Sequence, residues 1–169
     1  HGIDTIVAAA RLTQKQPIRW VIVGQGQDAP RIDALITETP EINIERHMWI
    51  AYEDLRNEIA RADVCLGIFG EGQKSARVIP NKVFQILAAG RPLVTRDGPA
   101  IRELLTGTEP AIKLVRAGNA SDLADAVTAL CEDATSPQPL HEDIVERFSE
   151  AVLAQEWQML VLEAAREGS

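Results

Sequence analysis

Short apolar segments alternate along this chain with amphipathic helical segments, and this alternation limits the possible folds more than any other sequence feature. Runs rich in Val, Ile and Leu, bounded by turn residues, predict strands at 18–23, 42–45, 62–69, 92–95 and 111–115. Apolar residues with a period near 3.6 predict helices at 2–14, 31–39, 53–61, 80–89, 99–105, 121–130 and 144–165, the last as one long helix or a pair of helices. Strands joined by helices form right-handed βαβ units. The sequence therefore predicts an α/β fold with a doubly wound parallel sheet, Rossmann-like and in three α/β/α layers.

The two ends of the chain depart from this regular alternation. The chain opens directly in a helix, although a doubly wound sheet begins with a strand, so we expect that a first strand is missing. Ser121 is expected to cap the penultimate helical region. Pro137 and Pro139 mark a break after it. We therefore expect a Rossmann-like domain over 1–136 and a helical tail over 137–169.

The composition is that of one soluble globular domain and excludes several classes of function. The chain has 169 residues, 46% of them hydrophobic, which suffices for one full core. A net charge of −8 argues against binding to nucleic acid, which normally requires a basic face. No apolar run approaches the ~18–20 residues of a membrane span. Cys65 and Cys131 suit free thiols in a reducing compartment, so we expect a cytoplasmic protein.

A glycine-rich turn follows the strand expected at 18–23, where ligands of doubly wound folds bind. Residues 24–29, Gly-Gln-Gly-Gln-Asp-Ala, fit the dinucleotide pattern G-x-G-x-x-G/A, and Glu45 ends the next strand. In an NAD-binding oxidoreductase domain this turn would approach the pyrophosphate and Glu45 would bind the ribose. The residues of that site would be Gly24, Gly26, Ala29 and Glu45. An ordinary strand-to-helix turn has the same pattern and is the favoured interpretation.

A polar loop and the helix start after it form a second candidate site. The loop carries Lys74 and Arg77, and Pro80 is expected in the first turn of the helix. The free N–H groups of residues 81–83 would point toward the strand ends. There the helix start, the Lys82 ammonium and the two basic side chains of the loop would converge on one phosphate-binding crevice. A solvated loop with an ordinary helix cap explains the same residues, and the pattern alone does not separate the two interpretations.

Three separate segments, in this order along the sequence, resemble one enzyme family. They are Arg-Ala-Asp-Val-Cys-Leu at 61–66, Pro-Asn-Lys-Val-Phe-Gln-Ile-Leu-Ala-Ala-Gly-Arg-Pro-Leu-Val at 80–94, and Pro-Ala-Ile-Arg-Glu-Leu-Leu at 99–105. In order and spacing they resemble the donor half of GT-B glycosyltransferases, and more narrowly the family 4 (group 1) enzymes. The resemblance extends from residue 2 to about 131. The tail is similar to the C-terminal helix that crosses back to the acceptor domain in those enzymes.

The resemblance implies a domain that binds a nucleoside-diphosphate sugar, UDP- or GDP-linked, for transfer to a glycan or lipid-linked acceptor in polysaccharide biosynthesis. Transfer would retain the anomeric configuration and would use neither a bound metal nor a cofactor. The acceptor side of the cleft belongs to an N-terminal domain that this chain lacks, so the isolated fragment is expected to be inactive. Peripheral association of the full-length enzyme with a membrane stays open.

The same resemblance assigns parts of the donor to positions in this sequence. The base would lie near the turn after Val23 and near Trp49, and the side chain of Gln85 would meet the ribose. The diphosphate would meet the helix start, where the Lys82 ammonium would stabilise the leaving group, and backbone groups of the preceding loop would face the sugar. The implied donor-binding residues are Gly24, Gly26, Trp49, Gly70, Glu71, Gly72, Ile79, Asn81, Lys82 and Gln85.

Two positions depart from the family's pattern. Its paired acids are spaced E-x7-E, and the corresponding positions here hold Arg77 and Gln85. The amide of Gln85 can still exchange hydrogen bonds with ribose hydroxyls, so donor binding survives these changes better than a charge-dependent role does. No residue is assigned a catalytic role. A non-catalytic glycosyltransferase homologue therefore stays open as an alternative, beside the NAD-binding oxidoreductase domain.

Overall fold

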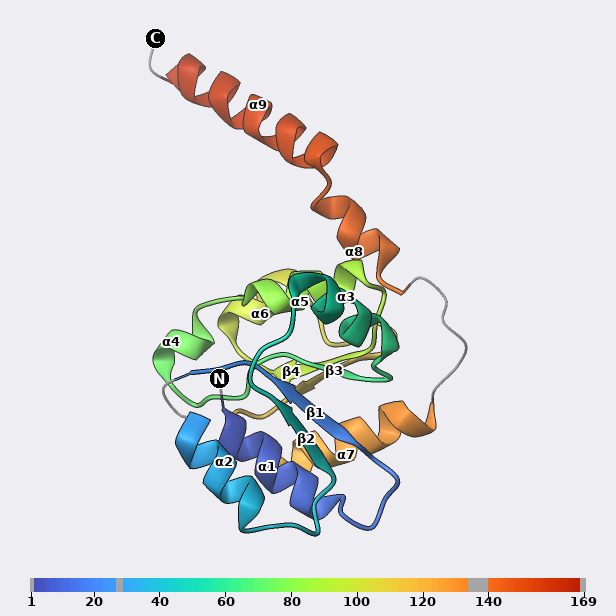
Figure 1. The fold of residues 1–169 in the computed structure, drawn as a ribbon. Helices are drawn as coiled ribbons and strands as arrows, with labels where there is room; N and C mark the ends of the chain where they lie inside the picture. The colour runs from blue at the N-terminus through green and yellow to red at the C-terminus, as the bar shows by residue number, and fades with distance from the viewer. Residues whose placement is uncertain (1, 27–28, 134–139, 168–169) are drawn as a thin grey trace.

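The computed structural model describes residues 2–26, 29–133 and 140–167 as helices packed around parallel strands (Figure 1). This order confirms the alternation predicted from the sequence. The elements are α1 (Ile3–Leu12), β1 (Trp20–Val23), α2 (Ala29–Thr37), β2 (Ile44–His47), α3 (Tyr52–Arg61), β3 (Cys65–Leu66), α4 (Gln73–Ala76), α5 (Asn81–Ala88), β4 (Leu93–Arg96), α6 (Pro99–Leu104), β5 (Ile112–Val115), α7 (Ala120–Glu132), α8 (Glu142–Arg147) and α9 (Glu150–Glu167).

The strands form two parallel sheets, where the sequence predicts one. β1 pairs with β2, from Trp20 opposite Ile44 to Val23 opposite His47. β3, β4 and β5 form the second sheet in that order. The α/β class with parallel strands flanked by helices is confirmed. The prediction of a single sheet is wrong, because within the described residues no ladder of hydrogen bonds joins β1 to β3.

Helix α1 shows that the strands of both sheets run in the same direction. At its start, Gly2 lies against the backbone that follows β3, and a Cβ placed on Gly2 would be 2.5 Å from the Gly70 nitrogen. At its end, the Trp20 indole at the start of β1 donates a hydrogen bond of 3.1 Å to the Thr13 hydroxyl. The helix thus runs from the carboxyl end of β3 to the amino end of β1. The carboxyl ends of both strands therefore lie at the same edge.

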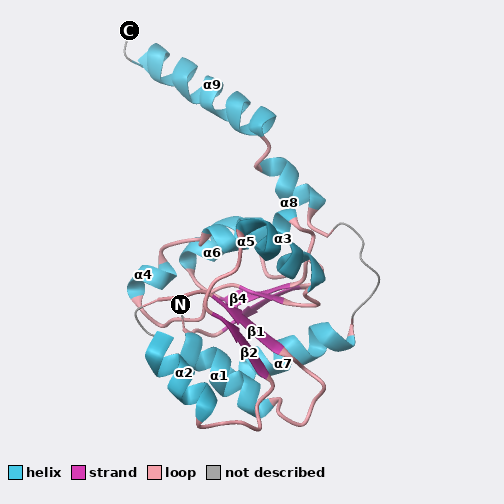
Figure 2. Cartoon of the chain, viewed as in Figure 1, coloured by secondary structure: helices cyan, strands magenta, loops and turns pink. Residues whose placement is uncertain are grey.

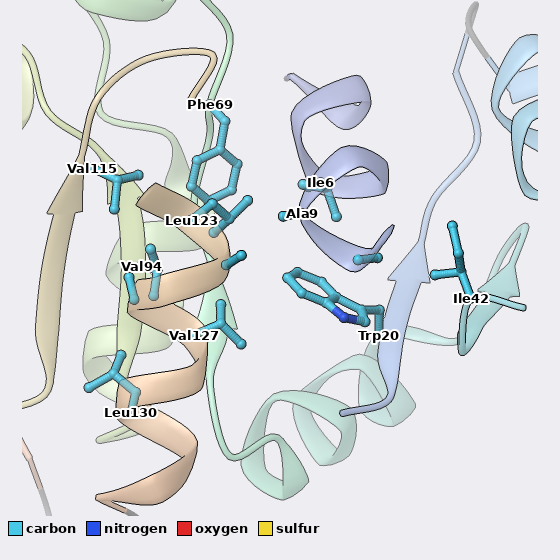
Figure 3. Packing of buried hydrophobic residues seen from close by; sticks show 13 residues of the cluster. Ile6, Ala9, Trp20, Ile42, Phe69, Val94, Val115, Leu123, Val127 and Leu130 are labelled. Carbon is cyan, nitrogen blue, oxygen red and sulfur yellow. The ribbon is translucent and has the colours of Figure 1, made fainter. Parts of the chain in front are cut away.

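Two apolar clusters fill the space on either side of the strands. The first packs α1 and α7 against both sheets and includes Trp20, Phe69 and Leu123, which Figure 3 shows from close by. The second, which includes Val83 and Ile144, packs α5, α6 and α8 against the other side of the larger sheet. Figure 2 shows α1, α2 and α7 on one side of the strands and α3, α5 and α6 on the other. These are the three layers that the sequence predicts.

The structure shortens the strand expected at 62–69 and adds a short helix after it. β3 covers only Cys65–Leu66, although Gly67 still donates its amide proton to the Val94 carbonyl at 2.8 Å. Gly67 lies so close to the next strand that an added Cβ would be 2.3 Å from the Thr95 hydroxyl. The loop expected at 70–79 contains α4, a single turn with no buried residue.

The cap of α7 also differs from the expectation. Asn119, rather than Ser121, caps this helix, because the Asn119 side chain accepts the amide proton of Asp122 at 2.9 Å. The helix therefore begins at Ala120, one residue before the expected cap. Asparagine, like serine, is a favoured N-cap residue, because its side-chain oxygen accepts an amide proton of the first helical turn.

The expected tail helix is a pair, α8 and α9. Phe148 packs edge to face on Phe84 of α5, with 5.5 Å between the ring centroids. α9 extends away from the layers (Figure 1), and Trp157 is exposed there rather than packed. The boundary expected at 136/137, together with Pro137 and Pro139, lies outside the described residues.

In the ranges that the structure describes, no helix is both long and apolar enough to span a membrane. No group of three or more His, Cys, Asp and Glu side chains in the same ranges could hold a metal ion. Cys65 and Cys131 are free thiols, and burial raises the pKa of Cys65 to about 11, so the reactive thiolate is scarce near neutral pH.

Truncation of the first apolar cluster should destabilise the whole chain. We expect Leu123→Ala to lower the free energy of unfolding by roughly 2–5 kcal/mol, because Leu123 is fully buried and its removal leaves a cavity. Leu12→Ala is the matched control, because Leu12 is 60% exposed and its truncation should change little. Urea unfolding followed by circular dichroism measures both variants, and equal effects would contradict this account of the core.

The contact of α8 with the layers should weaken in acid. His141 has a φ of 71°, and its ring Nε2 donates to the Arg91 carbonyl at 3.1 Å. Burial lowers the pKa of this imidazole, although the hydrogen bond to Arg91 and the charges of Asp143 and Glu109 partly oppose the shift. The unfolded chain therefore takes up the proton first, and stability is lost as pH falls through the unfolded pKa near 6.5.

The variant His141→Asn tests this pH dependence, because asparagine tolerates the left-handed backbone but does not titrate. We expect Tm to fall less between pH 7.5 and 5.5 in the variant than in the wild type. Parallel curves for the two proteins would exclude His141 as the group responsible.

Candidate functional site

The start of α5 lies beside the carboxyl edge of the larger sheet. Pro80 has an extended ψ of 146° and precedes the helix as its N-cap, which corrects its expected place in the first turn. Its carbonyl accepts the amide proton of Val83 at 2.9 Å, so this amide is not free, contrary to the expectation. No side chain caps α5. The amides of Asn81 and Lys82 are therefore the ones available to a ligand.

Lys82 extends from α5 to the segment that follows β3. Its half-buried ammonium donates to the Gly67 carbonyl at 3.2 Å. Burial lowers the pKa of this amine, because a desolvated ammonium loses hydration that one carbonyl does not replace. An anion beside Lys82 would favour the charged form.

Arg96 is a second half-buried cation that contacts the same segment, and the sequence analysis missed it. It ends β4, and its guanidinium donates to the carbonyls of Gly70 and Asp97. The available sequence signal was weak: a basic residue directly after an apolar strand. Two cationic side chains thus bind carbonyl oxygens of residues 67–70 at the carboxyl edge of the sheet.

The loop at 70–72 is held from several sides. The amide of Gly118 donates to the Phe69 carbonyl at 2.9 Å. Gly118 also leaves room for the side chain of Glu71, since a Cβ on Gly118 would lie 2.6 Å from the Glu71 carboxyl carbon. Glu71 and Gly72 are themselves exposed. The loop therefore has a fixed base and an accessible tip.

Gln85 lies one turn after Lys82 on α5 and is half-buried. Spacings of three and four residues place Gln85 on the same helix face as Lys82 and Asn81. Ile79 packs against the second apolar cluster, so its side chain belongs to the core. Of these predicted residues, Asn81, Lys82 and Gln85 share one surface, and Ile79 contributes packing.

The two basic residues of the loop do not join this site. Lys74 and Arg77 are both exposed, and Arg77 donates to Gln73 on its own helix α4 at 3.2 Å. Within the described residues, no hydrogen bond or ion pair joins either of them to Lys82. The expected convergence of three basic side chains is therefore replaced by the pair Lys82 and Arg96.

An arginine side chain holds the glycine turn after β1 through a hydrogen bond to its backbone. Gly24 has a φ of 133°, and its amide donates to the His47 carbonyl at 3.0 Å. The Arg46 guanidinium donates to the Gly24 carbonyl and pairs with Asp33 at 3.1 Å. Gly26 is exposed, and its carbonyl accepts the amide proton of Ala29. Residues 27–28 of the turn lie outside the described ranges.

Glu45 already has partners in this structure. One carboxylate oxygen accepts a hydrogen bond from Arg19 at 2.9 Å, and the other lies 2.7 Å from the His47 ring. A ribose at Glu45 would therefore share this carboxylate with an exposed ion pair, and the contacts alone leave the NAD-binding alternative open. Trp49 is 77% exposed after β2 and presents an open aromatic surface.

These elements supply the chemistry of an anion site. Two half-buried cations lie on one stretch of the carboxyl edge beside two helix amides for which the described residues supply no partner, and a polar side chain follows on the same helix. Fixed positive charge and N–H groups of this kind bind phosphate groups. The glycine turn and Trp49 lie at the end of the other sheet, on the same edge.

Several solved structures have the same fold as this chain. One is the sucrose-phosphate synthase from Thermosynechococcus elongatus, with 22% identity and a TM-score of 0.70 over 98% of this chain and 43% of that chain. Another is the lipopolysaccharide outer core galactosyltransferase WaaB in its apo form, with 16% identity and a TM-score of 0.69 over 96% and 45% of the two chains. Anabaena HepE, solved with UDP and glucose, matches at 18% identity and a TM-score of 0.65, over 94% and 44%.

The chain thus spans less than half the length of these solved proteins, and the likeness shows the fold. A search of curated protein sequences finds no match. The family described as glycosyl transferases group 1 matches residues 1–133, which is most of the sequence. This chain belongs to the group 1 glycosyltransferases.

Proposed function

We propose that this chain is the donor-binding half of a retaining glycosyltransferase and that it holds a nucleoside-diphosphate sugar, UDP- or GDP-linked, without a metal or another cofactor. The acceptor would be a glycan or a lipid-linked precursor in polysaccharide biosynthesis. The acceptor side of the cleft would come from an N-terminal domain, so this chain alone would bind donor without transferring the sugar. We place the reaction in the cytoplasm.

The observation that carries this proposal is the pair of half-buried cations at the carboxyl edge. Among the described hydrogen bonds, Lys82 donates to the Gly67 carbonyl and Arg96 donates to the carbonyls of Gly70 and Asp97. A chain of net charge −8 concentrates these two positive groups beside the open start of α5. A diphosphate would receive charge-assisted hydrogen bonds there, and the same charges would stabilise it as a leaving group.

The other predicted residues receive roles consistent with their places. Gln85 would exchange hydrogen bonds with the ribose, and the backbone of Gly70, Glu71 and Gly72 would face the sugar. Gly24, Gly26 and Trp49 would border the base, for which an exposed aromatic ring offers a stacking surface. The complex of Anabaena HepE with UDP and glucose supports a nucleotide and a sugar as ligands of this fold.

Nucleotide binding by the isolated chain tests the proposal directly. We expect one nucleoside diphosphate, UDP or GDP, to raise Tm in a concentration-dependent manner, while NAD does not. Lys82→Gln should weaken that binding about ten- to a hundred-fold, because a charge-assisted hydrogen bond contributes ~1.5–3 kcal/mol. Lys113→Gln, at an exposed lysine of β5, is the matched control and should bind as the wild type does.

Stabilisation by NAD alone would move the site to Gly24, Gly26, Ala29 and Glu45 and would overturn the proposal. Equal loss of affinity in Lys82→Gln and Lys113→Gln would show that only overall charge matters. Calorimetric titration distinguishes these results from a change in folding, because it reports affinity at a temperature where each variant is folded.

The role of Gln85 has its own test. We expect Gln85→Ala to weaken the nucleoside diphosphate about two- to ten-fold, as the loss of one or two neutral hydrogen bonds of ~0.5–1.5 kcal/mol predicts. The 2′,3′-dideoxy analogue of that nucleotide should bind the variant and the wild type equally. Gln158→Ala on α9 serves as the control. A loss of the same size for both nucleotides would assign Gln85 to some contact other than the ribose.

A full-length protein allows the non-catalytic alternative to be examined. Gln85→Glu restores the acid of the family's pattern, and we expect the variant to transfer sugar at a similar or lower rate than the wild type, because the amide already serves ribose binding. If the parent protein transferred no sugar with any donor and acceptor tried, that result would favour the interpretation as a non-catalytic, regulatory homologue.

A further inference from the structure

Arg46 occupies an inward position of strand β2, where the neighbouring positions hold apolar side chains. Ile22 and Ile44 pack against the first apolar cluster. Because side chains alternate along a strand, Arg46 lies on the same face as Ile44, and its register partner in β1 is Ile22. The side chain of Arg46 is only 12% exposed. An arginine at so enclosed a position needs partners for its guanidinium.

The guanidinium of Arg46 joins three segments of the chain. Its Nη1 donates to the Gly24 carbonyl in the turn after β1 and, at 3.0 Å, to the His47 carbonyl at the end of β2. Its Nε donates to the Asp33 carboxylate of α2 at 3.1 Å. Because Asp33 cancels the charge of Arg46, this guanidinium is suited to bridging backbone segments rather than to binding an anion.

The turn after β1 is placed by hydrogen bonds rather than by packing at its glycines. A Cβ built on Gly24 or on Gly26 would meet no atom of another segment within 4 Å. The Gly24 amide donates to the His47 carbonyl at 3.0 Å, and the Gly24 carbonyl accepts from Arg46. Arg46 thus contributes through its side chain to fixing where this turn lies relative to the end of β2.

The same guanidinium holds the start of the segment that carries Trp49. The His47 carbonyl accepts hydrogen bonds from both the Gly24 amide and the Arg46 side chain. Two residues of extended chain span at most ~7 Å, so the Trp49 Cα lies within that distance of the His47 Cα. The Trp49 side chain is 77% exposed. The two surfaces that border the base in the proposed function are therefore joined at one nitrogen atom of Arg46.

The separation of these two surfaces decides which base fits between them. Stacking on an aromatic ring accepts every base, because every base has a π face. A purine has two fused rings and a pyrimidine has one, so a gap of fixed width distinguishes them. Hydrogen bonds that hold the glycine turn and the Trp49 segment together supply such a fixed width.

We propose that Arg46 is a positioning residue of the donor site. By holding the carbonyls of Gly24 and His47 at one guanidinium, it fixes the gap between the glycine turn and Trp49 and thereby sets the selectivity of the site between uracil and guanine. Asp33 keeps the guanidinium in the orientation that this requires. The inference rests on the proposed function, because it places the base between these two surfaces. Arg46 itself would touch neither the base nor the diphosphate.

The ratio of the affinities for UDP and GDP tests this role. We expect the wild type to bind one of the two nucleotides about ten-fold more tightly. In Arg46→Met, which keeps an unbranched apolar stem but lacks the donors, this ratio should fall about five- to ten-fold, as the loss of the hydrogen bonds to the two carbonyls predicts. Arg46→Lys keeps a cationic donor and should give an intermediate ratio. A general loss of stability or of phosphate binding would weaken both nucleotides alike and leave the ratio unchanged.

Arg19→Met is the matched control. It removes a guanidinium of the neighbouring segment, one that pairs with Glu45 at 2.9 Å and is exposed. Because Glu45 alternates with Arg46 along β2, this pair lies on the other face of the strand, and we expect the ratio of the wild type. Calorimetric titration of UDP and GDP into each variant measures the affinities at a temperature where that variant is folded.

Each outcome decides the inference. An unchanged ratio in Arg46→Met, or an equal change in Arg19→Met, would overturn it and leave donor binding intact. Equal affinity of the wild type for UDP and GDP would also overturn it, because Arg46 would then have no selectivity to set. A folded wild type that binds neither nucleotide would overturn the proposed function, and this inference with it.

A second variant applies if Arg46→Met does not fold. Asp33 is 45% exposed, so Asp33→Asn is the milder change. It removes the charge that orients the Arg46 guanidinium, and the ratio of affinities should fall in the same direction as in Arg46→Met. A folded Asp33→Asn protein with the ratio of the wild type would then overturn the inference.

Discussion

The packing of α1 against α7 is the interaction on which the rest of this structure depends. In the described residues no hydrogen-bonded ladder joins the two sheets, so their common direction rests on the apolar cluster around Trp20, Phe69 and Leu123. Two contacts at the ends of α1 set the register of this packing. Gly2 fits against the backbone after β3, and Thr13 accepts the Trp20 indole proton. A side chain at position 2 would separate the helix from that backbone.

The charges of the chain divide into two kinds. Several arginines have carboxylate partners on the surface, as in the pairs of Arg102 with Asp97 and of Arg116 with Asp122. Within each pair the two opposite charges cancel. Exposed pairs of this kind contribute little to stability. Lys82 and Arg96 instead donate to carbonyl oxygens and keep their net charge at a partly buried edge. Acidic composition and an anion site are therefore compatible, because the positive field is local.

Sequence reasoning succeeded where the determining interactions are local. The alternation of apolar runs and helical periods predicted most elements, and the helix start at Asn81 and Lys82 follows from a contiguous motif. It missed the cap of α7 although that choice is local, because Asn119 and Ser121 are both good cap residues and lie two positions apart. It also failed where distant residues decide, since the role of Arg96 depends on the carbonyl of Gly70, 26 positions away. The interruption of the sheet depends on which strands pair, which periodicity does not contain.

The two parts of the candidate site lie on different sheets. The glycine turn at Gly24 follows β1, whereas Lys82 and Arg96 contact the segment after β3. Within the described residues no ladder of hydrogen bonds joins these sheets, so the placement of one part relative to the other rests on the apolar cluster around Trp20, Phe69 and Leu123. Hydrophobic contacts are not directional, so this cluster fixes the edge less strictly than a hydrogen-bonded ladder would. A ligand that contacts both the glycine turn and Lys82 would therefore itself bring the two parts into register.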